Sequence, residues 1–594
     1  MRLADLNRHL FEVDCRIDHP DAQQSFSLPS WIPGSYLLRE FARHVVEISA
    51  SSEGRAVPVT KVDKNSWRCD GAKEELIVTI VVYALDRSVR GAYLDGTRGF
   101  FNGTCLFLLP QGRDTEPVTV TMAAPEDERA AAWRVATAMS HEDIDSRGFG
   151  RYSAADYDEL IDHPFEISDF SSTEFHAGRV RHELVLAGRH DTDPDRVATD
   201  LAQLCDTVIR FFGSEPPFPD YRFLTLVVSK GYGGLEHRAS SSLIIGRDAM
   251  PRVGEPGVPR NYQRFLSLCS HEYFHNWNIK RIKPAAFTPY RLDRRNYTRL
   301  LWVFEGITSY YQDLLLLRSG LIGANDYLIR LGQLLTRVYR MPGRHYQNLE
   351  ESSFDAWDKL YKPEPNSGNS TISYYSKGAL VALALDLTLR TAPDSRATLD
   401  DVMIELWQRH GATGRGVDES SFEALAAEVS GIELDEFFES AVRGTADLPL
   451  DELLAEFGVA FNLRPASGGD DQGGIKVVVE GATPKLGLGA LFKDRETGIT
   501  LTQIVEGGVA EAAGLIPGDH LLALNGLQVS AAGLTELLSR FEEDEAVTAS
   551  VFRDESLLQM KLAMKREPAS TCYLELNADA DADSRARREQ WIGS

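Results

Sequence analysis

Cysteine is scarce in this 594-residue chain, and its few cysteines are not paired in sequence. They stand at positions 15, 69, 105, 205, 269 and 572, without a C-x-x-C motif. This pattern excludes a disulfide scaffold and a cysteine-rich zinc cluster, and it favours reduced thiols in a cytoplasmic protein. Cys269 is expected to be a small buried hydrophobic residue and not a ligand.

Long apolar runs are also missing. The longest, "LIVTIVVYAL" at 76–85, is too short to cross a bilayer and is typical of a buried strand. The N-terminus shows neither an apolar h-region nor a small-residue cleavage site, so no secretory signal is recognisable. A cytoplasmic location is favoured, and a periplasmic one stays possible if the N-terminus has been matured or trimmed.

Positive charge is in deficit, because 63 lysines and arginines face 88 aspartates and glutamates, for a net charge of −25. A nucleic-acid-binding protein needs a basic face, so this class is disfavoured. The balance favours solubility and a cationic group on the substrate. With 43% hydrophobic and 25% charged residues, the composition is that of a globular protein, and the length predicts three or four domains.

Composition and hydrophobic periodicity divide the chain into four parts. Short alternating runs predict an N-terminal antiparallel β-sandwich over 1–165, and mixed strands with long helices predict an α+β domain over 166–460. A Gly- and Asp-rich linker at 464–474 precedes a compact strand-rich module at 475–568. The tail, 569–594, begins as low-complexity sequence and is expected to be exposed, although Trp591 offers a docking residue.

The stretch "CSHEYFHNWN" at 269–278 contains H-E-x-x-H at His271, Glu272 and His275. No Pro or Gly interrupts residues 262–280, and apolar side chains recur at helical spacing at Leu266, Cys269, Tyr273 and Trp277. One helical turn brings two imidazoles onto one face, where they can hold one metal ion. Glu272, offset beside that ion, can take a proton from water. An accidental match or a structural histidine pair is the alternative.

A catalytic zinc site takes three protein ligands, so one more is required. Asn278 and Arg281 occupy the Gly and His positions of the metzincin motif and exclude that solution. Glu305 is a carboxylate set in the middle of the apolar helical run at 299–317. A buried carboxylate needs a cation, which zinc would supply, and an ion pair with Arg299 is the alternative.

These residues resemble the gluzincin peptidases, in which a Glu on the next helix completes H-E-x-x-H. The segment "GYGGLEH" at 231–237, expected on or beside the edge strand of the cleft, resembles the G-A-M-E-N element of zinc aminopeptidases. The resemblance implies that Gly233 and Gly234 bind substrate and that Glu236 binds its N-terminal ammonium. An ordinary strand-end carboxylate is the alternative. His237 replaces the family's Asn and is assigned no ligand role.

The segment "YYSKG" at 374–378 resembles the Y-x-K-G element of the same enzymes. The resemblance aligns Tyr375 with their catalytic tyrosine, whose phenol would stabilise the oxyanion of the tetrahedral intermediate. Tyr374 is the adjacent competitor, and core packing of both tyrosines is the alternative.

"LGLGALF" at 486–492, with the glycine-rich stretch that follows, resembles a PDZ domain. In such a domain the backbone N–H groups of a loop, here Leu486, Gly487, Leu488 and Gly489, hold the C-terminal carboxylate of a peptide or protein. Packing between domains is the alternative role.

The segment "WIPGSY" at 31–36 is similar to a signature of the glycyl aminopeptidase family of gluzincins. That resemblance covers nearly the whole chain and implies a multidomain α+β protein: an N-terminal β-sandwich-like domain, a thermolysin-like zinc peptidase domain and a C-terminal PDZ domain. It implies one Zn²⁺ per chain and peptide substrates with a free N-terminus, preferably Gly or Ala. The 30 positions between His275 and Glu305 exceed the spacing of G-A-M-E-N aminopeptidases, and the segment 284–297 accounts for the excess.

The resulting hypothesis is a zinc aminopeptidase in which His271, His275 and Glu305 hold the metal and Glu272 is the general base. One rival is a zinc endopeptidase that recruits proteins through the PDZ domain. The other is a PDZ scaffold with an inactive zinc site. The S1 pocket is not recognisable in the sequence.

Overall fold

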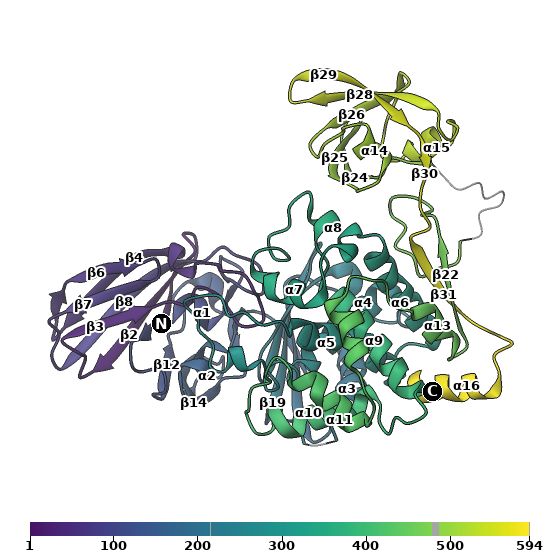
Figure 1. Ribbon diagram of the computed structural model, residues 1–594. Coiled ribbons are helices and arrows are strands. Elements are labelled where there is room, and N and C mark those ends of the chain that lie inside the picture. The colour runs from purple at the N-terminus through teal and green to yellow at the C-terminus, as the bar shows by residue number, and fades with distance from the viewer. Residues whose placement is uncertain (214, 478–485, 593–594) are drawn as a thin grey trace. The chain divides into compact units, whose positions relative to one another are not determined.

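The computed structural model describes residues 1–213, 215–477 and 486–592. The chain forms two compact units, Met1–Tyr297 with Met403–Asp418, and Thr298–Val402 with Glu419–Ser594. Residues 478–485 of the predicted module and 593–594 of the predicted tail lie outside the described ranges. Figure 1 labels many of the elements named below.

The N-terminal part of the first unit is built from antiparallel strands, as the alternating sequence predicts. Strand β8 (Glu75–Tyr83) lies between β2 (Leu10–Asp18) and β4 (Val45–Ser52), and alternate side chains of β8 are buried. A second sheet, which contains β3 (Gln23–Ser27) and β7 (Ser66–Asp70), shares one hydrophobic core with the first. Alternation of apolar and polar residues is what a sheet with one covered face requires.

The rest of the first unit centres on a five-stranded sheet with the order β17-β18-β19-β21-β20. Strands β18 (Val180–Ala187), β19 (Asp220–Val228) and β21 (Ser240–Gly246) are parallel neighbours, and β17 (Ser171–Ala177) pairs antiparallel with β18. At the other edge β20 (Tyr232–Glu236) pairs antiparallel with β21. The segment 231–237 therefore lies at a sheet edge, as predicted.

Helix α4 (Arg260–Phe274) carries the H-E-x-x-H motif, but it ends earlier than the sequence predicts. The uninterrupted pattern through residue 280 suggested a longer helix, whereas His275 is already the C-cap and turns follow. The Asn276 side-chain amide donates to the Tyr273 carbonyl at 2.9 Å. Such a local side-chain hydrogen bond competes with the next helical turn, so the prediction of helix beyond residue 274 is wrong.

In the second unit Glu305 lies in a short π-helical turn, η5 (Trp302–Gly306), that continues into α5 (Ile307–Arg318). Such turns, inserted in α-helices, are frequent at functional sites. Helix α9 (Ser376–Thr391) packs against η5, where a Cβ added to Gly306 would lie 2.6 Å from the Cα of Gly378. Two glycines thus permit the close approach of the segments that carry Glu305 and Tyr375.

A C-terminal module is inserted between β22 (Val459–Arg464) and β31 (Thr571–Leu576), which pair with each other. Its sheet runs from the edge strand β24 (Ala490–Asp494) through β25, β26 and β28 to β29. These partners are β25 (Ile499–Ile504), β26 (His520–Leu524), β28 (Ala546–Arg553) and β29 (Ser556–Ala563).

The tail ends in helix α16 (Ala582–Ile592), most of which is exposed, as the sequence predicts. Trp591 is fully buried, and its indole Nε1–H donates to the Tyr310 hydroxyl of α5 at 2.9 Å. A buried indole contributes a large apolar area together with one polar contact. Docking of Trp591 therefore explains why the tail is ordered despite its low-complexity start.

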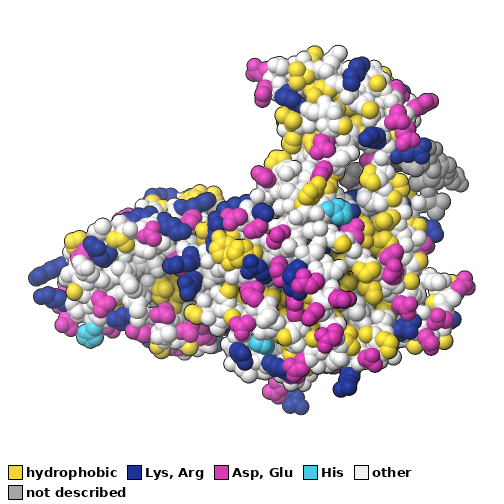
Figure 2. Space-filling model, viewed as in Figure 1, with side chains coloured by type: hydrophobic (Ala, Val, Ile, Leu, Met, Phe, Trp, Pro, Cys, Tyr) yellow, Lys and Arg dark blue, Asp and Glu magenta, His cyan; other side chains and the backbone are white. Residues whose placement is uncertain are grey.

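Among the described helices, none is long and apolar enough to cross a membrane. Figure 2 shows acidic and basic side chains interspersed over the face in view, without an extended basic field. This surface agrees with the net charge of −25.

Candidate metal centre and substrate-binding strand

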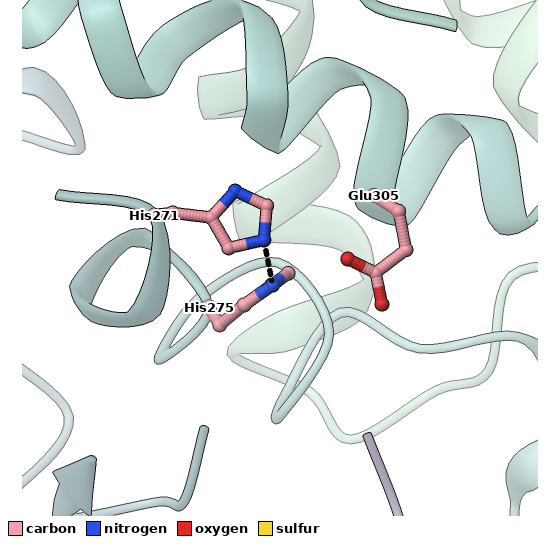
Figure 3. Close-up of side chains that lie close together, drawn as sticks. All are labelled: His271, His275 and Glu305. Carbon is pink, nitrogen blue, oxygen red and sulfur yellow. Dashed lines mark hydrogen bonds between the residues drawn. The ribbon is translucent and has the colours of Figure 1, made fainter. Parts of the chain in front are cut away.

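His271, His275 and Glu305 come together as a candidate metal centre. One ligand atom from each lies within 4.8 Å of the others, and Figure 3 shows the Glu305 carboxylate directed toward the two imidazoles. The Nε2 atoms of the histidines are 3.0 Å apart. Two nitrogens that bind one tetrahedral zinc ion lie roughly 3.3 Å apart. The donor set and its convergence therefore fit zinc.

The orientation of His275 is fixed by a backbone contact that the sequence did not reveal. Its Nδ1 is 2.6 Å from the carbonyl oxygen of Asn278, in the turn that follows α4. Because a carbonyl only accepts, Nδ1 carries the proton and donates. Nε2 is thereby left as the lone-pair nitrogen for a metal, the usual arrangement of metal-binding histidines. Because α4 ends at Phe274, the chain turns and brings the Asn278 carbonyl beside the His275 ring.

Arg299, the alternative ion-pair partner of Glu305, contacts other residues instead. Its Nε lies 3.9 Å from Glu350, at the ion-pair limit, and its guanidinium packs over the Phe354 ring. Glu305 itself is buried. A charge removed from water needs an opposite charge nearby, and zinc held with the histidines would provide it.

Glu272 lies directly against the edge strand β20. A Cβ added to Gly234 would lie 2.0 Å from the Glu272 Oε1 atom, so no other residue fits at 234 without displacing that carboxylate. Glu236, Glu272 and His275 also bring ligand atoms within 4.8 Å of one another. Glu236 is buried, and its Oε1 atom has no hydrogen-bond partner among the described residues. Two close carboxylates of this kind form a site for a cation, such as an ammonium group.

The segment 31–36 closes the end of this site, a role that its sequence did not reveal. Gly34 has a φ of +90°, and a Cβ added there would lie 2.5 Å from both Glu236 carboxylate oxygens. The segment is anchored by the Trp31 indole, which donates to the Arg291 carbonyl at 2.9 Å. The long segment 284–297 between His275 and Glu305 therefore holds the turn at 31–36, whose Gly34 lies against Glu236.

We expect Gly34→Ala to lower kcat/KM for a free-amine glycyl substrate by about tenfold or more. The new methyl group must push away the Glu236 carboxylate, and a positive φ adds roughly 1–2 kcal/mol of backbone strain. Steady-state kinetics with the glycyl substrate measure the effect. Gly71→Ala is the matched control, because Gly71 also has φ of +90° but nothing within 4 Å of the added Cβ. Equal activity of both variants would contradict the proposed contact.

A buried ionic network holds the end of β20. The Lys280 ammonium donates to Asp162 at 2.6 Å, and His237 Nδ1 lies 3.6 Å from the same carboxylate. Burial alone would raise the pKa of Asp162, but Lys280 and His237 keep it well below its usual range. Burial lowers the pKa of His237, which favours its neutral form at pH 7. The network ties His237, the residue after Glu236, to Asp162, which caps the C-terminal end of α2 (Tyr157–Ile161).

Three tyrosines gather next to α9. The hydroxyls of Tyr375 and Tyr361 are 2.9 Å apart, and the Tyr374 ring stacks on Tyr375 with centroids 4.7 Å apart. Burial raises the pKa of Tyr374 well above its ordinary value, and nearby Tyr361 and Glu305 act in the same direction. The Tyr374 phenol is therefore expected to be protonated at neutral pH. Tyr361 was not predicted, because no sequence motif marks it.

The loop predicted to bind a carboxylate lies in the C-terminal module. Leu486 and Gly487 form the short strand β23 (Leu486–Gly487), which pairs with β30 (Lys565–Arg566). The carbonyls of Leu488 and Gly489 accept hydrogen bonds from Ala510 and Val505.

Two protein-family models match the chain. The peptidase M61 N-terminal domain matches residues 1–169, and the M61 glycyl aminopeptidase model matches residues 264–381. A search of curated proteins found no match.

Solved structures add one full-length relative. The crystal structure of an aminopeptidase N family protein from Idiomarina loihiensis is 39% identical, with a TM-score of 0.95, and the match covers 100% of this chain and 99% of that one. An M1 zinc metallopeptidase from Deinococcus radiodurans is 14% identical, with a TM-score of 0.46 over 75% of this chain and 92% of its own. The second similarity carries no part of the assignment.

The buried His-His-Glu centre and these matches define a zinc metallopeptidase of the aminopeptidase class. The chain belongs to the peptidase M61 family. This agrees with the resemblance drawn from the sequence motifs, and the class implies a zinc cofactor.

Proposed function

We propose that the protein removes the first residue from peptides that have a free N-terminus, with a preference for Gly or Ala. The observation that carries this proposal is the convergence of Glu236 with Glu272 and His275 within 4.8 Å. A carboxylate at that position pairs with the substrate ammonium and so sets the first peptide bond beside the general base. The crowding of Gly34 against Glu236 and the name of the matching family model support a small first residue.

His271, His275 and Glu305 would hold one zinc ion per chain, which when bound supplies a Lewis acid that acidifies water and polarises a carbonyl. Glu272 accepts a proton from the attacking water and passes it to the leaving amine. Tyr375 donates a hydrogen bond to the developing oxyanion, and Tyr361 orients that phenol. Glu236 keeps the substrate ammonium in place throughout, while Gly233 and Gly234 line the substrate backbone along the strand edge.

We assign the C-terminal module as a PDZ-like domain that accepts a peptide or protein C-terminus. Two features support this: β24 is an edge strand, and the preceding Gly489 has a φ of +64°. A Cβ added to Gly489 would lie 2.6 Å from the Cα of Gly508, so only glycine fits. An edge strand beside a backbone loop is the arrangement that receives an added peptide strand.

A panel of aminoacyl reporter substrates, with and without a chelator, tests the proposed function. We expect glycyl and alanyl reporters to be cleaved fastest, because their side chains need the least room beside Gly34. Metal removal should lower activity more than about 100-fold, and one equivalent of zinc should restore it. The same activity in metal-depleted protein, checked by elemental analysis, would overturn the proposal.

A further inference from the structure

The guanidinium of Arg90 lies at strand β20, and no acidic side chain of the described residues pairs with it. It comes from the N-terminal β region, and its Nη2 donates to the Gly234 carbonyl at 3.1 Å. A Cβ added to Gly233 would lie 3.9 Å from its Nη1 atom. Arg90 is partly exposed, its Nε is buried without a hydrogen-bond partner, and it makes no ion pair with any described residue. In a chain of net charge −25, the Arg90 guanidinium at this position is suited to bind a negatively charged ligand.

Arg90 and Glu236 mark two positions on β20 that are two residues apart. The carbonyl that Arg90 contacts belongs to Gly234, two residues before Glu236 on β20. Two residues of a strand span about 7 Å. An extended dipeptide also spans about 7 Å from its amine to its carboxylate. A dipeptide that runs antiparallel to β20, with its ammonium at Glu236, therefore brings its carboxylate to the level of Arg90.

The position of Glu272 agrees with this arrangement. Its carboxylate lies against Gly234, where an added Cβ would be 2.0 Å from Oε1, and it also brings a ligand atom within 4.8 Å of one from Glu236. Glu272 is thus close to both ends of such a ligand. The single peptide bond of a bound dipeptide then lies beside the general base. Arg90, Gly234, Glu236 and Glu272 all belong to the first compact unit.

We propose that Arg90 binds a carboxylate on the residue that follows the scissile bond, and that this carboxylate is the C-terminus of a dipeptide. The preferred substrates are then dipeptides with a small first residue. An acidic side chain on the second residue offers the same chemistry. This inference rests on the proposed aminopeptidase function, because it uses Glu236 as the ammonium site. Bidentate pairing with a carboxylate is the interaction for which arginine is best suited.

The experiment compares kcat/KM for Gly-Ala, Gly-Ala-amide and Gly-Asp-amide in the zinc-loaded full-length protein. We expect Gly-Ala to exceed Gly-Ala-amide at least tenfold, and Arg90→Gln to bring that ratio close to one. Arg90→Lys keeps the positive charge but loses the paired N–H donors of the guanidinium, so it should give an intermediate ratio of Gly-Ala to Gly-Ala-amide. Arg87→Gln is the matched control and should keep the wild-type ratio, because Arg87 is exposed and contacts Tyr93.

The outcomes separate the two sources of the carboxylate. A Gly-Asp-amide rate well above that of Gly-Ala, lost in Arg90→Gln, identifies the acidic side chain as the preferred carboxylate and overturns the dipeptide assignment. A wild-type ratio near one, or equal losses on Gly-Ala and Gly-Ala-amide in Arg90→Gln, overturns the inference and leaves Arg90 as a clamp on β20. Chelator-sensitive cleavage of Gly-Ala-amide would still support the aminopeptidase function, whereas no chelator-sensitive cleavage of any of the three would overturn that function itself.

Discussion

Glu272→Gln should retain zinc and lose nearly all peptide hydrolysis, with kcat lower by about 10²–10⁴-fold, the usual contribution of general acid–base catalysis. The amide fills the same space against Gly234, so the fold and the metal ligands are left in place. It cannot accept a proton from water and return it to the leaving amine. Steady-state kinetics and elemental analysis on the same sample measure both properties.

The matched control for this variant is Glu126→Gln, which changes an exposed carboxylate of the same unit. It should keep wild-type activity and metal content. A zinc-loaded Glu272→Gln protein with undiminished turnover would remove Glu272 from the mechanism. Loss of zinc from that variant would instead show that Glu272 supports the metal site.

Glu236→Gln should lower kcat/KM for free-amine glycyl substrates by about 30-fold or more, because truncating one partner of a buried charge pair costs about 2–5 kcal/mol. The loss should appear mainly as a higher KM, since the ammonium contact is made in the bound substrate as well as in the transition state. Kinetics with a glycyl reporter and its N-acetyl counterpart measure the change.

The N-acetyl substrate is the internal control, because it carries no ammonium for Glu236 to bind. The selectivity for the free amine should collapse in Glu236→Gln while zinc content stays at the wild-type level. Undiminished turnover of glycyl substrates by this variant would remove its role and favour the endopeptidase alternative.

Much of the metal centre was predictable because its signals are local. His271 and His275 are one helical turn apart, so their convergence follows from helix geometry alone. Glu305 required one further step: a carboxylate in the middle of an apolar run needs a cation. Its π-helical setting was not predictable, since that depends on the packing of Gly306 against Gly378.

The substrate end of the site was less predictable because it depends on contacts between distant segments. Gly34 reaches Glu236, and Arg90 reaches Gly234 across 144 positions, without any periodic pattern that connects them. In the tail, Trp591 could be named as a docking residue, but its partner Tyr310 could not, because the contact joins positions 281 residues apart. Such contacts are decided by tertiary packing and not by local propensity.

The β-rich N-terminal region was recognised from alternation, yet its contribution to the site was not. Its sequence predicts a sheet with one covered face, which says nothing about the loops at the sheet ends. These loops supply Gly34 and Arg90, and both lie against β20. The N-terminal β region therefore belongs to the proposed substrate site as well.

The most direct test of an amine-directed zinc peptidase is the ratio of kcat/KM for a glycyl reporter to that for its N-acetyl form, measured on the zinc-loaded wild-type protein. The buried Glu236 carboxylate beside Glu272 predicts a ratio of about 100 or more. A ratio near one, with zinc bound, would contradict the account, because it would show that the free amine is not what the site recognises.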